Sequence, residues 1–173
     1  VAVRSLAELK RPDATLLIVG GASGTEGETE IAHVHALMQE LKVENQVRFV
    51  APQAHHILST YYRAADVVLV PSRSESFGLV ALEAAACGTP VVANAVGGLL
   101  TIVEHGRTGF LVPDRQPEIF ARHIANILDD PALSARMSHD AAERAKGYTW
   151  SFAAARLRRA YTDITSRDRV VCK

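Results

Sequence analysis

Hydrophobic residues in this chain form five short runs, each bounded by glycine, proline or polar residues. Runs of this length are typical of strands buried inside a parallel sheet. The predicted strands cover residues 14–19, 47–50, 67–70, 90–96 and 110–112. Between them, apolar residues recur at helical spacing, which predicts helices over 29–41, 57–65, 77–87 and 99–104. The alternation predicts an α/β fold, with a Rossmann-like parallel sheet and helices on both faces.

Both ends of the chain are predicted to be helical. The opening residues are apolar at helical spacing until Pro12. Because the chain starts inside this pattern without a methionine, we expect a piece of a longer protein; ordinary N-terminal processing is the alternative. After position 113 further helices follow, one capped by Asp130 and started by Pro131. The last helix has an apolar face made by Trp150, Ala154, Leu157, Tyr161 and Ile164. We therefore predict one domain over 1–165 and a frayed tail over 166–173.

Composition narrows the function classes. The chain has 173 residues, of which 48% are hydrophobic and 22% charged, as is ordinary for one globular domain. Its formal net charge is zero, so a nucleic-acid partner is not expected. Its apolar runs are too short for a transmembrane segment, and no signal peptide is recognisable. The cysteines, Cys87 and Cys172, lie far apart, which disfavours a disulfide and favours a cytoplasmic location.

Residues 71–90 carry the strongest indication of function. Glu75 lies on a polar loop and Glu83 inside an apolar helix, with seven residues between them. Over residues 76–103, Glu83 is the only Asp, Glu, Lys, Arg or His. A carboxylate in such a helix is costly to bury unless a polar group meets it. Glu83 is therefore a candidate ligand for a ribose diol. A salt bridge to Arg63 or Arg73, or a backbone partner, is the alternative.

Three more features are expected at the same edge, because ligands of open α/β sheets bind at the carboxyl ends of the strands. The glycine-rich turn over 20–24 could place N–H groups on a phosphate, and a simple tight turn is the alternative. Its sequence matches neither the dinucleotide-binding fingerprint nor the P-loop. The helix start at 76–79 presents unpaired N–H groups and a partial positive charge, with capping by Ser76 or Glu75 as the alternative. For Gly97-Gly98 a plain turn is the favoured interpretation.

Other chemistry is not indicated by the sequence. The histidine pairs at 33/35 and 55/56 lack the spacing of a zinc site, so no metal is expected. The serines at 72, 74 and 76 lack the context of a hydrolase nucleophile. Cys87 has no base near it in sequence and is expected in the core.

The stretch Glu75-Ser-Phe-Gly-Leu-Val-Ala-Leu-Glu83, with Gly-Thr-Pro-Val-Val at 88–92 and Gly97-Gly98, resembles the Glu-x7-Glu motif of retaining group 1 glycosyltransferases. The turn ending at Gly21 and the stretches 47–50, 61–72 and 108–113 also fit, so the resemblance covers about residues 1–165. It implies the C-terminal, donor-binding half of a GT-B fold. Within the family, the stretch is most similar to enzymes that transfer N-acetylglucosamine from UDP-N-acetylglucosamine to inositol 3-phosphate. Sucrose-phosphate synthases and phosphatidylinositol mannosyltransferases share most of these residues.

The resemblance also implies roles for individual residues. Glu75 and the N–H groups at 76–78 would contact the donor sugar, and Glu83 would contact the ribose. The N–H groups at 79–80 would bind the distal phosphate. The backbone near position 48 would pair with the base. The donor-binding residues expected in this way are Gly21, Arg48, Glu75, Ser76, Phe77, Gly78, Leu79, Val80 and Glu83. The catalytic role is assigned to Glu75.

The resemblance further implies a retaining transfer from a UDP-sugar such as UDP-N-acetylglucosamine or UDP-glucose, without metal or cofactor. The leaving phosphate itself would act as base, so the site would stabilise negative charge rather than supply a nucleophile. The family's phosphate-binding Arg and Lys, and its N-terminal acceptor-binding domain, would lie before residue 1. We therefore expect the chain alone to bind UDP weakly and to be inactive. A non-catalytic nucleotide-sugar-binding module and a purely structural domain are the alternatives.

Overall fold

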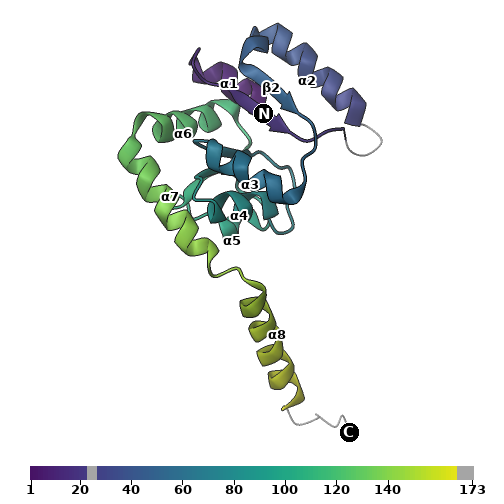
Figure 1. The fold of residues 1–173 in the computed structure, drawn as a ribbon, viewed down its shortest axis with the longest axis vertical. Helices are drawn as coiled ribbons and strands as arrows, with labels where there is room; N and C mark the ends of the chain where they lie inside the picture. Colours follow the sequence, from purple (N-terminus) through teal and green to yellow (C-terminus); the bar gives the residue numbers. More distant parts are fainter. Residues whose placement is uncertain (23–26, 167–173) are drawn as a thin grey trace.

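The computed structural model describes residues 1–22 and 27–166, which form two parallel sheets with helices packed on them (Figure 1). Strand β1 (Leu16–Val19) pairs with β2 (Val47–Val50). Strands β3 (Val68–Val70), β4 (Val91–Asn94) and β5 (Gly109–Val112) form the second sheet in that order. All the pairings are parallel, so the predicted α/β class with Rossmann-like winding is confirmed.

The helices alternate with the strands as expected up to β5 and then follow one another. In chain order they are α1 (Ala2–Leu9), α2 (Gly27–Leu41), the short 3-10 helix η1 (Glu44–Gln46), α3 (His55–Ala64), α4 (Leu79–Ala86), α5 (Leu99–Ile102), α6 (Pro117–Asp129), α7 (Pro131–Ala145) and α8 (Trp150–Thr165). The predicted cap of α7 is confirmed, because Asp130 Oδ1 accepts the N–H groups of Ala132 at 3.0 Å and Leu133 at 2.9 Å.

The three-stranded sheet is covered by helices on both faces. On one face, Val91 and Ala93 of β4 pack with the small residues Ala81 and Ala84 of α4. On the other, Val92 of β4 packs with apolar residues of α6 and α7, among them Phe120 and Met137. Successive strand residues point to opposite faces, so a continuous apolar run serves both layers.

The expectation of one continuous sheet is wrong in one respect. Within residues 1–22 and 27–166 no ladder joins β1 to β3, and the two sheets are linked by α1, which packs against α6. The predicted full burial of the first strand also fails: α1 and α2 cover one face of β1, while Leu17 on the opposite face is 44% exposed. An apolar run shows that a strand can be buried, but not which edges pair or whether both faces are covered.

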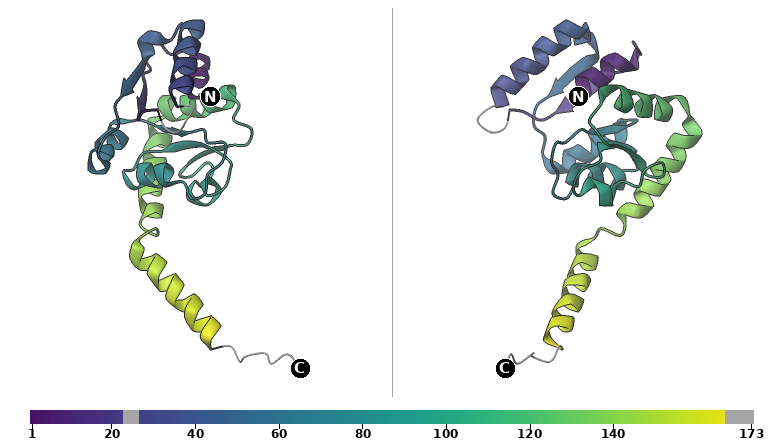
Figure 2. Two further views of the ribbon diagram at one scale, coloured as in Figure 1. Left: turned by 90° about the vertical axis from the view of Figure 1, so that its right-hand side faces the viewer. Right: turned by 180° about the vertical axis from the view of Figure 1, so that it is seen from behind.

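Helix α8 stands away from the rest of the structure (Figures 1 and 2). Its predicted apolar face is present but uncovered, and the side chain of Trp150 is 92% exposed. The limit of the predicted domain at 165 stays a prediction, and residues 167–173 of the predicted tail, including Cys172, lie outside the described residues.

Candidate functional site

The loop that joins β3 to α4 is held at its base by two residues from neighbouring strand ends. Asn94, the last residue of β4, is 3% exposed, and its Nδ2 donates to the carbonyl of Ser72 at 3.0 Å. Asn94 Oδ1 accepts the N–H of Arg115 at 3.2 Å, and Arg115 Nε donates to the carbonyl of Pro71 at 2.8 Å. A buried amide with both ends paired is a fixed anchor, so the loop leaves the sheet in one direction.

Glu75 forms the next anchor of this loop. Its Oε1 accepts the N–H of Gly78 at 3.1 Å, just before α4. Its backbone carbonyl accepts the N–H of Gly98 at 2.9 Å. The capping interpretation is not realised, because Glu75 meets the N–H of the N-cap residue Gly78 and not those of the first turn; its carboxylate lies beside the start of α4. A single carboxylate can accept further hydrogen bonds, so this contact leaves Glu75 able to meet a ligand.

Gly97 and Gly98 are more than the plain turn that the sequence favoured. A Cβ on Gly97 would lie 1.8 Å from the carbonyl oxygen of Glu75, and one on Gly98 would lie 2.2 Å from that of Phe77. Gly97 also has a φ of +50°, a conformation that residues with a Cβ adopt at a cost. The two glycines therefore let the backbone after β4 pack directly on the backbone of the Glu75–Phe77 segment.

The start of α4 is open to solvent. Gly78 precedes it with a φ of +95° and is buried, whereas Ser76, Phe77, Leu79 and Val80 are exposed. No acidic residue lies in the first turn, and the side chain of the N-cap residue makes no capping bond. The first N–H groups of a helix have no partner inside it and carry a partial positive charge. An anion could approach this helix start without displacing a side-chain cap.

Glu83 lies one turn further along α4 and is met by two residues of α3. Tyr62 Oη donates to Glu83 Oε2 at 2.9 Å, and His55 Nε2 lies 2.9 Å from Glu83 Oε1. The pKa of Tyr62 is raised well above that of an ordinary phenol, mainly because the hydroxyl is buried and secondly because it donates a hydrogen bond to Glu83. The partners proposed from the sequence, Arg63 and Arg73, form none of the described hydrogen bonds to Glu83.

Gly21 and Arg48 belong to the other sheet. Gly21 follows β1, and a Cβ there would lie 3.2 Å from Pro52 Cγ. Arg48 is an exposed residue of β2, and its Nη1 donates to the carbonyl of Val47 at 3.3 Å. The described hydrogen bonds do not join either residue to α4. Residues 23 and 24 of the predicted turn over 20–24 lie outside the described residues.

Sequence reasoning missed four residues of this site: His55, Tyr62, Asn94 and Arg115. Asn94 had a usable signal, because a polar residue that ends an apolar run marks the carboxyl end of a strand. The other three had none, since their partners are distant in sequence and belong to other elements.

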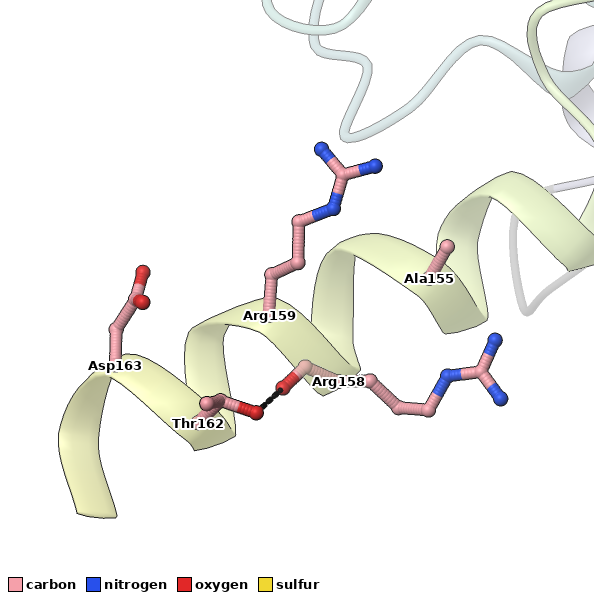
Figure 3. A pocket seen from close by; sticks show the side chains of 5 residues that line it. All are labelled: Ala155, Arg158, Arg159, Thr162 and Asp163. Atoms are coloured by element: carbon pink, nitrogen blue, oxygen red, sulfur yellow. Dashed lines mark hydrogen bonds between the residues drawn. The ribbon is translucent and has the colours of Figure 1, made fainter. Parts of the chain in front are cut away.

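A separate hollow lies on α8 and does not belong to this site. It is lined by Ala155, Arg158, Arg159, Thr162 and Asp163 of that one helix (Figure 3). Elsewhere in residues 1–22 and 27–166, no group of three or more His, Cys, Asp or Glu side chains is placed to hold a metal. No helix of that same part is long and apolar enough to span a bilayer.

Comparison with known proteins gives a consistent picture. The family described as glycosyl transferases group 1 matches residues 1–144. D-inositol 3-phosphate glycosyltransferase 2 of Catenulispora acidiphila is 45% identical over 97% of this chain and 40% of its own length. The D-inositol 3-phosphate glycosyltransferase of Kribbella flavida is 49% identical over 86% of this chain and 35% of its own length. The chain thus spans about 40% or less of these relatives.

Solved structures agree with the fold. Sucrose-phosphate synthase from Thermosynechococcus elongatus superposes with a TM-score of 0.83 at 38% identity, over 95% of this chain and 42% of that one. Anabaena HepE in complex with UDP gives a TM-score of 0.83 at 29% identity, over 94% of this chain and 44% of that one.

Proposed function

The chain belongs to the group 1 glycosyltransferase family, and on this premise we propose that it is the donor-binding half of a retaining enzyme that uses a UDP-sugar. The observation that carries the proposal is the uncapped start of α4, with the carboxylates of Glu75 and Glu83 to either side. A nucleoside diphosphate offers an anion for the helix start and hydroxyl groups for the two carboxylates. HepE, whose structures contain UDP or UDP-glucose, supports uracil as the base.

In this proposal the chain acts by stabilising the leaving diphosphate. The N–H groups of Leu79 and Val80 bind the distal phosphate, and charge that builds on this phosphate during transfer strengthens the contact. Glu75 and the backbone over 76–78 hold the sugar. Glu83 holds the ribose, and Gly21 and Arg48 complete the site around the phosphate and the base. The reaction proposed needs no metal and retains the anomeric configuration.

The acceptor is proposed from the relatives. Both curated relatives described above are named for D-inositol 3-phosphate, which supports an inositol phosphate acceptor in the whole protein. UDP-N-acetylglucosamine is proposed as the donor from the resemblance of residues 71–90. A sucrose-phosphate synthase activity with UDP-glucose is the second candidate, supported by the 38% identity to that structure. A cytoplasmic location stays a prediction that rests on the cysteine content.

The partner that we propose is an acceptor-binding domain of a longer parent chain. The apolar face of α8 supports this proposal, because Leu157, Tyr161 and Ile164 are 53%, 59% and 67% exposed. Trp150 is the only tryptophan, so its fluorescence reports on this face alone. Acrylamide should quench Trp150 strongly in this chain and weakly in a parent protein whose other tryptophans are replaced by phenylalanine. Equal quenching in both would refute a contact between α8 and the added domain.

Titration calorimetry with UDP tests the donor site. We expect the unmutated chain to bind UDP in the presence of EDTA, and Glu83→Gln to weaken binding about tenfold or more, because a charged acceptor is lost. Glu118→Gln, on the exposed first turn of α6, is the matched control and should bind as the unmutated chain does. An absence of binding by the unmutated chain, or equal affinity in Glu83→Gln, would refute the proposed site.

A transfer assay separates an enzyme from a non-catalytic module. The parent protein should transfer sugar from UDP-N-acetylglucosamine to an inositol phosphate, whereas the isolated chain should not. Turnover by the isolated chain would contradict the proposal that catalysis needs both halves. UDP binding by a parent that transfers to no acceptor would favour the module.

A further inference from the structure

Helix α3 presents two polar side chains to Glu83 from the same face. His55 and Tyr62 are seven positions apart, which is close to two full turns of helix. They meet different oxygens of one carboxylate, His55 at Oε1 and Tyr62 at Oε2, both at 2.9 Å. A carboxylate held at both oxygens by one helix has a defined orientation, which is what a ligand with two adjacent hydroxyl groups requires.

Tyr62 is the fixed one of these two partners. Its ring packs against the buried cluster that contains Ala81 and Ala84 of α4. Its backbone carbonyl accepts the hydroxyl of Thr89 at 2.6 Å, and Thr89 is 3% exposed. A phenol keeps its proton at physiological pH, and the raised pKa of Tyr62 extends this to more alkaline pH, so the hydroxyl donates continuously to Glu83. Tyr62 therefore orients the carboxylate before any ligand arrives.

His55 is the exchangeable partner. Its side chain is 83% exposed and it is the first residue of α3, whereas the Glu83 side chain is 29% exposed. An exposed polar contact of this kind contributes little stability, so solvent or another donor can replace it. The ring nitrogen that faces Glu83 must carry a proton in order to donate, as a sugar hydroxyl would in its place.

We propose that Tyr62 and His55 are positioning residues of the donor site: Tyr62 fixes Oε2 of Glu83, and His55 occupies Oε1 until a vicinal diol of the donor replaces it. This inference rests on the proposed function, since it assigns the partners of Glu83 in a nucleotide-sugar site. It makes opposite predictions for the two residues. Removal of the Tyr62 hydroxyl should weaken the recognition of a diol, whereas removal of His55 should remove a competitor.

The experiment compares UDP with 2′,3′-dideoxyuridine diphosphate by calorimetry in neighbouring variants. Tyr62→Phe should reduce the preference for UDP over the dideoxy compound about tenfold, because one hydrogen bond to a charged group is lost. Tyr61→Phe is the control, because the Tyr61 hydroxyl makes none of the described hydrogen bonds; this variant should keep that preference. His55→Ala should bind UDP about threefold more tightly, because Oε1 of Glu83 is then free to accept from the ligand. His56→Ala should bind UDP as tightly as the unmutated chain does.

The outcomes distinguish this inference from the proposed function. If the unmutated chain does not bind UDP, both fail. If it binds UDP in a manner that depends on Glu83 but Tyr62→Phe behaves as Tyr61→Phe does, only the role of Tyr62 fails. If His55→Ala weakens UDP binding, then His55 helps to bind the ligand, and the proposal that the ligand replaces His55 at Glu83 is wrong. Circular dichroism shows whether Tyr62→Phe folds; should it not fold, the His55 and His56 variants decide the inference.

Discussion

Replacement of Gly97 by alanine should disturb the loop that carries Glu75 without changing any side chain of the site. The added Cβ would lie 1.8 Å from the Glu75 carbonyl oxygen, so the two backbones must separate by roughly 1 Å or more to reach a tolerable contact. The φ of +50° at Gly97 adds a second cost, about 1 kcal/mol for a residue with a Cβ.

Gly106 separates these two costs. Its φ is +79°, yet a Cβ there would meet nothing within 4 Å. Gly106→Ala should therefore show only the conformational cost, about 1 kcal/mol. In Gly97→Ala the unfolding free energy should fall by that amount and by about 2 kcal/mol more, because the added Cβ overpacks the contact with Glu75. The difference of about 2 kcal/mol between two glycine variants is the quantity that the packing of Gly97 on Glu75 predicts.

Urea unfolding followed by far-UV circular dichroism measures this difference. Calorimetry with UDP on the folded variants measures its effect on the site. We expect UDP affinity to fall about tenfold or more in Gly97→Ala, because a displacement of roughly 1 Å moves Glu75 and the start of α4 apart. Gly106→Ala should bind UDP normally. Equal unfolding free energies in the two variants, or unchanged UDP affinity in a destabilised Gly97→Ala, would refute the reasoning.

Three further predictions concern stability. Asp130→Ala should lower the unfolding free energy by about 1 kcal/mol through loss of the α7 cap, and Asp130→Asn should nearly preserve it. Burial, followed by the proximity of His105 and Arg122, lowers the pKa of His123. The unfolded chain therefore takes up the proton first, and stability falls as pH drops below about 6.5. His123→Phe should flatten this fall in acid urea titrations, and the exposed His33→Phe should not. The pKa of Tyr62 is raised, so the unfolded chain loses the phenol proton first and stability falls as pH rises above about 10. Glu83→Gln should make this fall in unfolding free energy with pH shallower. An unchanged fall would contradict the hydrogen bond between Tyr62 and Glu83.

The fold was predictable where it depends on local pattern. Five apolar runs became five strands, and Asp130 before Pro131 became a helix cap, because periodicity and capping are properties of neighbouring residues. The division into two sheets and the exposure of Leu17 were not predictable, because each depends on which elements meet in space. The exposed face of α8 has the same cause: its spacing predicts an apolar helix face but not what covers that face.

The site shows a sharper limit. Glu83 was conspicuous because no other charged residue lies near it in sequence, and that contrast pointed to a polar partner without identifying it. The partners of Glu83 are His55 and Tyr62, and nothing in the sequence around them indicates this role. They reach Glu83 only because α3 packs on α4. Gly97 and Gly98 likewise matter for the space that they leave to the backbone of the Glu75 loop. The conspicuous carboxylates therefore locate the site, whereas their orientation is set by less conspicuous residues of α3 and of the turn after β4.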